Sequence, residues 1–339
     1  DTINGIGLLV GGMLIPFFAL WSIGDSSMVD GLLKVYEFAP EKFNVIGATD
    51  SVMPFEVLFT GLIINQLYFW GMNQTIIQRA LGAKNLKEAQ KGLLLTGLFK
   101  ILIPLVIILP GVICYYYFQD SFFGNQDAVY PELVKKVLPV WMIGFFAAVI
   151  MGAVLSTFNS VLNSIATLFS VGIYKRHINS EATDSKMVRV GKITSAVLAL
   201  AAIFTAPMVA NASDGLYQLL QQLNGIFFIP IASILLAGFF MKKVSALGAK
   251  VALIFGLFFY IFMSWGYTSH GIHFIHLWGI EFVLNVIIMY AVSYFSPRKN
   301  MYEVTDVGVV DLVSWKYTKA MSVALCAITI VIYILLGNS

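Results

Sequence analysis

Apolar stretches of about 20 residues recur along almost the whole chain, and they limit the fold more strongly than any other feature of the sequence. A helix needs about 20 mainly apolar residues to cross the hydrocarbon core of a bilayer. Composition agrees, because 59% of the residues are hydrophobic and only 12% are charged, whereas soluble domains carry roughly 25% charged residues. The sequence therefore predicts an all-α integral membrane protein, which we expect in the plasma membrane, a bacterial inner membrane being the natural setting.

Nine membrane helices are predicted, and no polar linker is long enough to separate domains, so residues 1–339 are expected to form a single transmembrane domain. The fourth span is too long for one straight crossing. It is expected to begin as a tilted or re-entrant piece near Leu138 and Pro139, or to bend at Gly144 or Gly152. Pro230 predicts a kink in the sixth span. The predicted spans are 2–23, 54–74, 92–117, 140–173, 190–211, 215–240, 249–268, 274–295 and 318–336.

Lysine and arginine concentrate in alternate loops, which sets the orientation of the spans. Sixteen of the 21 basic residues lie in or beside the loops 75–91, 174–189, 241–250 and 296–317. These loops are therefore predicted to be cytoplasmic, and the chain is predicted to begin on the cytoplasmic side and to end outside.

Two of the opposite loops are long enough to fold. They are expected to contain short helices at Met28–Phe38 and at residues 128–138, the latter with Pro131 in its first turn. We expect these helices to pack at the membrane interface; a gate over a solute path is the alternative.

The fourth span carries a row of small polar residues. It reads Ala153-Val-Leu-Ser156-Thr157-Phe-Asn159-Ser160-Val-Leu-Asn163-Ser164. Hydroxyl and amide groups are costly in lipid unless something pairs with them, so this helix is expected to face protein, water or an ion. Because neutral oxygens can replace the hydration shell of a monovalent cation, the row suggests an ion site inside the membrane.

The second span places Gln66, Phe69, Trp70 and Asn73 on one helix face. An amide beside an aromatic ring suits a polyol, whose hydroxyls meet the amide while its C–H face stacks on the ring. An aromatic core face with an interhelical amide bond is the alternative. On the sixth span, Gln221 is the natural candidate to point inward.

Only Lys100 and Glu281 place an unambiguous charge well inside a span. Each costs about 2.5–3.5 kcal/mol on insertion scales, so each should face a cavity or a partner. We expect a functional role for Lys100, with a structural pairing as the alternative, and a structural role for Glu281.

Other function classes find little support. Cys114 and Cys326 lie in apolar spans and are expected to be small core residues rather than a disulfide or metal pair. The cluster His270, His273 and His276 lacks helical register and is not expected to bind a metal. A net charge of +3 without a basic stripe does not indicate nucleic acid. Without a nucleophile–base pair or a phosphate loop, we expect no enzyme.

Several runs of residues resemble the sodium:solute symporter family, most closely its sodium/glucose (sodium/galactose) cotransporters. The similarity covers essentially the whole chain. The runs are Leu67–Lys84, with its Asn-Gln-x-Ile-x-Gln-Arg pattern; Lys100 followed by Pro104 and Leu109-Pro110-Gly111; Ser156–Tyr174; and Ile229-Pro230-Ile-Ala.

The resemblance implies a leucine-transporter-type fold, in which two inverted five-helix repeats hold sodium and solute at broken helices near the midplane. Members commonly have fourteen helices, and the nine predicted here would be the last nine. We therefore expect the N-terminal helices, including the unwound first core helix, to be missing from this fragment. Asp1 would match an acidic residue part-way along the family's sixth helix.

The resemblance also implies the ligands of sodium. The common sodium site of the family matches the carbonyl of Ala153 and the hydroxyls of Ser156 and Thr157, where most members have two serines. Some members bind a second sodium, and that site matches Asp1, Asn159 and Ser160. Here Asn159 replaces a serine or threonine.

In the sugar-transporting branch, positions matching Gln66, Lys100 and Gln221 bind the sugar, while Phe69 stands where a stacking tyrosine is usual, followed by Trp70. The resemblance thus implies sodium-coupled symport of a sugar or polyol by alternating access, with an oligomer allowed but not required. The alternatives are another solute (sialic acid, an amino acid or a vitamin), a channel, or a non-transporting fragment or sensor of the same fold.

Overall fold

The computed structural model describes residues 2–49, 51, 53–119, 126–210, 216–298, 308 and 310–337. Within these ranges every regular element is a helix and there is no strand. Eight helical segments are long and apolar enough to cross a membrane, which makes the chain a multi-pass membrane protein. They are Thr2–Ile23, Leu86–Phe118, Val140–Ile178, Asp184–Pro207, Leu216–Phe240, Ala246–Gly266, Phe274–Phe295 and Thr318–Leu336. Eight of the nine predicted spans are therefore confirmed as long helices.

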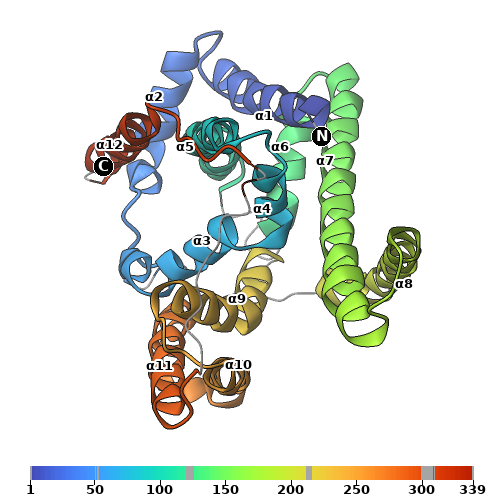
Figure 1. Cartoon of the computed structure of the whole chain (residues 1–339). Coiled ribbons are helices and arrows are strands. Elements are labelled where there is room, and N and C mark those ends of the chain that lie inside the picture. The colour runs from blue at the N-terminus through green and yellow to red at the C-terminus, as the bar shows by residue number, and fades with distance from the viewer. Residues whose placement is uncertain are drawn as a thin grey trace. The chain divides into compact units, whose positions relative to one another are not determined.

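The chain divides into two compact units, which we describe separately. Unit 1 comprises Asp1–Val45, Leu93–Gly215 and Lys319–Ser339, and unit 2 comprises Ile46–Gly92 and Leu216–Thr318. The elements of unit 1 are α1 (Thr2–Ile23), α2 (Met28–Phe38), the 3-10 turns η1 (Pro40–Phe43) and η4 (Gln126–Ala128), most of α5 (Leu86–Phe118), α6 (Val129–Val137), α7 (Val140–Thr167), η5 (Leu168–Ile178), α8 (Asp184–Ala210) and α12 (Thr318–Leu336) (Figure 1).

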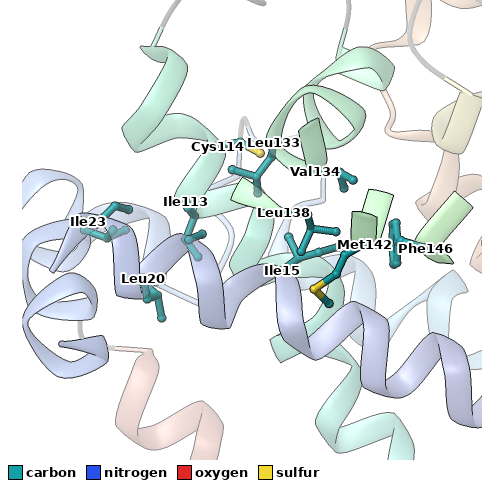
Figure 2. Close-up of a cluster of buried hydrophobic side chains, with 12 residues drawn as sticks. Ile15, Leu20, Ile23, Ile113, Cys114, Leu133, Val134, Leu138, Met142 and Phe146 are labelled. Carbon is teal, nitrogen blue, oxygen red and sulfur yellow. The ribbon is translucent and has the colours of Figure 1, made fainter. Parts of the chain in front are cut away.

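The core of unit 1 forms where α1, α5, α6 and α7 meet. Ile15 of α1, Ile113 of α5 and Leu133 of α6 are fully buried in one hydrophobic cluster, which Met142 and Phe146 of α7 complete (Figure 2). Cys114 is part of this cluster and 2% exposed, as predicted for a small core residue. Cys326 is exposed, so the corresponding prediction is wrong for it, because α12 buries none of its residues.

The long fourth span starts directly after Pro139, which N-caps α7, and runs as one helix to Thr167 before it continues as the π-helical segment η5 (Figure 1). A break near Gly144 or Gly152 does not occur, since α-helix is continuous through both. η5 carries Lys175 and Arg176 in its last turn.

Both short surface helices are confirmed. The first is α2, whose N-cap Ser27 accepts a hydrogen bond from the Asp30 amide at 3.3 Å. The second is α6, which has Pro131 in its first turn. Whether either acts as a gate stays a prediction.

Unit 2 contains η2 (Phe55–Phe59), α3 (Gly61–Gly71), α4 (Gln74–Leu81), the first turns of α5, α9 (Leu216–Phe240), α10 (Ala246–Ile261), the π-helical η6 (Phe262–Gly266), η7 (Thr268–His270) and α11 (Phe274–Phe295). Its core includes Ile229 of α9, Tyr260 of α10 and Trp278 of α11, each 0% exposed. α9 remains helical through Pro230.

The second predicted span, 54–74, is wrong as a single helix. Residues 55–81 instead form η2, α3 and α4 in succession (Figure 1). With 11 residues, α3 is only about 16 Å long, too short for a bilayer of about 30 Å. The chain breaks at Met72 and Asn73 because the Asn73 side chain caps α4, accepting a hydrogen bond from the Thr75 amide at 2.9 Å.

Candidate functional site

The predicted sodium ligands lie together on the middle of α7 in unit 1. Ala153, Ser156 and Thr157 are spaced i, i+3 and i+4, so they lie on one face of the helix, and Asn159 and Ser160 follow in the next turn. Thr157 and Asn159 are exposed in this unit, whereas Ala153, Ser156 and Ser160 are half-buried. The polar row is thus accessible, as a row that contacts an ion or further protein must be.

The hydroxyl groups of the row donate back to their own helix. Thr157 Oγ1 donates to the Ala153 carbonyl at 3.0 Å, so two predicted ligands touch directly, and Ser160 Oγ donates to the Ser156 carbonyl at 2.9 Å. The hydroxyl protons of Thr157 and Ser160 are therefore paired within the helix, while their oxygen lone pairs are left to accept a cation. This arrangement fits a cation better than an anion.

Asn4 of α1 is a polar residue beside this row that the sequence did not single out. Its Nδ2 donates to the Gly152 carbonyl at 3.2 Å. A Cβ on Gly152 would meet Asn4 Oδ1 at 2.8 Å, so a larger residue at this position would displace the Asn4 side chain. The Asn4 side-chain amide thus joins the start of α1 to α7 at Gly152, the residue before Ala153. Asp1, the acid expected in a second sodium site, lies outside the described residues.

The predicted solute-binding face on α3 is present up to the helix end. Trp70 Nε1 donates to Gln66 Oε1 at 3.0 Å, which joins the amide to the indole one turn away. The Phe69 ring packs edge-on against Trp70 with centroids 5.2 Å apart. Gln66 is exposed, and Phe69 and Trp70 are half-buried. Asn73 does not belong to this face, because it caps α4 instead.

Gln221 lies on α9, which packs against α3 in the same unit. The two helices meet through rings: Phe228 lies 4.6 Å from Tyr68 and 6.3 Å from Phe69, centroid to centroid. Gln221 is half-buried, and its Oε1 accepts a hydrogen bond from Asn224 Nδ2 at 3.2 Å. In unit 2, Gln66, Phe69 and Trp70 therefore lie on α3 and Gln221 lies on α9, two helices that pack together, and the chain breaks where α3 ends.

Lys100 lies on α5 within unit 1 and is exposed there. Because α5 begins at Leu86, six residues before the predicted start, Lys100 is about 21 Å along the helix. The structure thus places Lys100 in one unit with the candidate sodium ligands and the other solute-binding candidates in the second unit. A complete solute site stays a prediction.

Glu281, for which the sequence predicted a structural role, is fully buried in unit 2. Around it gather further buried polar groups that have no hydrogen-bond partner among the described residues: Asn285, Tyr260 Oη and Trp278 Nε1. The position of a Cβ on Gly256 would be 2.7 Å from both Glu281 Oε1 and Asn285 Nδ2. The sequence did not predict this cluster, because apolar residues lie on all sides of α11 and no face of the helix stands out as the buried one.

The three clustered histidines each have a different partner. His270 Nε2 bonds the Met263 carbonyl at 2.9 Å, His273 caps α11, and His276 Nδ1 bonds Thr60 Oγ1 at 2.9 Å. Within the described ranges no group of three or more metal-ligating side chains occurs.

Comparison with known proteins gives these residues a context. The model of the sodium:solute symporter family matches residues 1–256. An uncharacterized symporter of Escherichia coli K12, YidK, is 41% identical over 333 residues, which are 98% of this chain and 58% of that protein. The sodium/glucose cotransporter of Vibrio parahaemolyticus is 32% identical over 287 residues, 78% of this chain and 52% of that protein. The chain thus spans about half the length of the curated relatives that it matches.

A solved structure agrees in fold. The substrate-bound, outward-open form of a Na+-coupled sialic acid symporter superposes with a TM-score of 0.72, covering 90% of this chain and 62% of the other, at 20% sequence identity. This confirms the transporter fold expected from the resemblance. The matched family and the relatives lead to one conclusion: the chain belongs to the sodium:solute symporter family.

Proposed function

We propose that the protein containing this chain is a sodium-coupled symporter of a sugar or polyol, working by alternating access in a bacterial inner membrane, and is not an enzyme. The observation that carries the proposal is the polar row of α7, where a backbone carbonyl and two hydroxyls from Ala153, Ser156 and Thr157 share one turn at membrane depth. Family membership supports the same reading, since relatives bear the names of sodium/glucose and sodium/myo-inositol cotransporters.

In the proposed mechanism, sodium binds to the oxygens of Ala153, Ser156 and Thr157. Binding at this turn favours the conformation that completes the solute site, so that two ligands shift one conformational equilibrium. One charge moving down the membrane potential releases about 2.3 kcal/mol per 100 mV, which is roughly a 50-fold solute gradient per ion. A second sodium ion bound at Asp1, Asn159 and Ser160 would double the free energy that the membrane potential supplies per transport cycle.

The solute class follows from the amide and aromatic groups of α3 and α9. Gln66 presents an amide that is already oriented by Trp70, and Gln221 presents another that is oriented by Asn224. Amides accept and donate at once, as a hydroxyl-rich solute requires, and the neighbouring rings offer a stacking surface. Lys100 adds a donor. Because Phe69 has no hydroxyl and Gln66 has a long side chain, glucose and galactose are not assumed.

A carboxylated sugar is the second candidate. The fold matches that of a sialic acid symporter, and Lys100 is a cation well inside a predicted span, as recognition of a carboxylate requires. A sialic acid and a neutral sugar differ in their need for this charge. Lys100→Gln should therefore abolish uptake of a carboxylated solute but only weaken uptake of a neutral one.

The direct test is uptake in proteoliposomes by the intact protein, using radiolabelled hexoses, inositols and sialic acid, with sodium or potassium outside. We expect one neutral sugar or polyol to accumulate in sodium only. Accumulation of sialic acid alone would move the assignment to the second candidate. Accumulation of no panel member would remove the sugar assignment.

The sodium ligands are tested by Ser156→Ala combined with Thr157→Ala. We expect the double variant to lose sodium-dependent uptake. The matched control is Thr194→Ala with Thr205→Ala on α8, since these hydroxyls donate to their own helix in the same way at 3.0 and 3.2 Å. If the α7 variant kept the sodium dependence of the wild type, the ion assignment would be wrong.

A further inference from the structure

A cavity of about 520 Å³ lies where the end of α9 meets the end of α11 in unit 2. Five of its eight lining residues are apolar or aromatic, two are lysines and one is a serine. Its volume is typical of ligand pockets. The lining residues are Met241, Lys242, Lys243, Val244, Tyr290, Ser293, Tyr294 and Pro297.

The floor of the cavity is well packed and therefore preformed. Met241 and Val244 pack against the buried cluster of Ala237, Ala252 and Met289. Ser293 Oγ accepts a hydrogen bond from the Ser245 amide at 2.9 Å, which ties the turn before α10 to α11. A ligand would thus find the walls in place.

The described lining of the cavity carries two positive charges and no negative one. Lys242 and Lys243 are exposed, and neither forms an ion pair with any residue that the structure describes. Both lie in the loop 241–250, which the distribution of Lys and Arg assigns to the cytoplasmic side. An anionic group would therefore complete the site.

The position of the cavity selects a lipid as the source of that anion. α9 and α11 are both membrane-spanning, and the cavity lies at their ends. Tyr290 and Tyr294 are 65% and 76% exposed on α11, as aromatic residues are at the boundary between lipid and water. Basic pockets between helices on the cytoplasmic side bind acidic head groups, whose acyl chains lie along the apolar helix surface.

We propose that this cavity binds the head group of an anionic phospholipid, with Lys242 and Lys243 on the phosphate and with Tyr290 and Tyr294 against the glycerol backbone and upper acyl chains. The site lies at the opposite end of α9 from Gln221, so it is separate from the proposed solute site. The inference does not depend on transport, and lipid binding can be measured without a substrate.

Native mass spectrometry of the intact protein in detergent tests the site, with phosphatidylglycerol and phosphatidylcholine of the same acyl chains as probes. We expect retention of phosphatidylglycerol and at least tenfold weaker retention of phosphatidylcholine. Because each lysine near an anionic lipid contributes about fivefold, Lys242→Gln with Lys243→Gln should lower phosphatidylglycerol affinity about 30-fold. The charge-preserving pair Lys242→Arg with Lys243→Arg should keep it.

The control pair is Lys186→Gln with Lys192→Gln, two exposed lysines of α8 that are predicted to lie on the same side of the membrane and do not line the cavity. Equal weakening by the control would show general surface charge and overturn the site. Equal retention of the two lipids would do so as well. Displacement of the lipid by millimolar inorganic phosphate would assign the cavity to a free anion instead.

Discussion

Gly225 of α9 lies in a tightly packed part of the unit 2 core, and its replacement by alanine tests how that core packs. A Cβ at this position would meet Trp278 Nε1 and the Tyr260 ring, and would be 2.6 Å from Tyr260 Oη. Trp278 and Tyr260 are both 0% exposed. Since neither ring has solvent to move into, Gly225→Ala should push α9 away from α10 and α11.

A matched substitution on the same helix isolates the free-energy cost of this clash. Gly238 has nothing within 4 Å of its Cβ position. Both Gly→Ala changes gain the same helix propensity, about 1 kcal/mol. The difference between the two variants therefore reports the clash alone, which we expect to be about 1–3 kcal/mol from overpacking a filled core.

The assay is thermal unfolding of the intact protein in one detergent, followed by loss of the monodisperse peak on size exclusion. Gly238→Ala should match or exceed the wild type in Tm, and Gly225→Ala should fall several degrees below Gly238→Ala. Equal Tm values for the two variants would refute the close approach of α9 to Trp278 and Tyr260.

Three further predictions concern other parts of the molecule. Glu281→Gln keeps side-chain volume but removes an ionisable group that has no cationic partner among the described residues, so its Tm should equal or exceed that of the wild type. Glu281→Ala should lose about 2–5 kcal/mol by leaving a cavity, and a Tm of Glu281→Gln well below that of the wild type would show that a charged carboxylate is needed. Trp70→Phe removes the Nε1 donor to Gln66 but keeps a ring, so the KM for the solute should rise several-fold with little change in sodium affinity. An unchanged KM would show that Gln66 does not bind the solute. At the α1–α2 corner, the hydrogen bond from Lys34 at 2.8 Å lowers the pKa of Asp25 below 3.8, and Asp25 raises the pKa of Lys34 above 10.5. The pair is complete between those values and is lost as the pH falls through the pKa of Asp25, so the protection factors of the α2 amides, which are corrected for the intrinsic pH dependence of exchange, should fall further between pH 5 and 3 in the wild type than in Asp25→Asn.

The sequence was sufficient for the features that depend on local composition. The spans of α1, α11 and α12 agree with their predicted bounds, because about 20 apolar residues insert as a helix whatever their neighbours are. α2 was predictable for a similar reason, since Ser27 precedes an amphipathic run and caps it. Family membership also came from short runs that can be read without a structure.

The break between α3 and α4 could not be predicted from local composition. Residues 61–72 are mostly apolar and aromatic, and nothing in them shows that the Asn73 side chain accepts a hydrogen bond from the Thr75 amide and so starts a new helix. A polar residue on a helix face and a polar residue at a helix cap look alike in sequence, because the same side chain serves both. The backbone decides which role it takes.

Residue chemistry and span length were thus determined by the sequence: which segments cross the membrane, which of them carry hydroxyls, amides or a charge, and to which family they belong. Tertiary packing alone decided the partners. It buried Glu281 beside Asn285, brought Asn4 onto Gly152, and placed Lys242 and Lys243 in the lining of a cavity. The physical reason is that insertion depends on summed hydrophobicity along the chain, whereas each polar contact depends on how two helices approach, and residues distant in sequence set that approach.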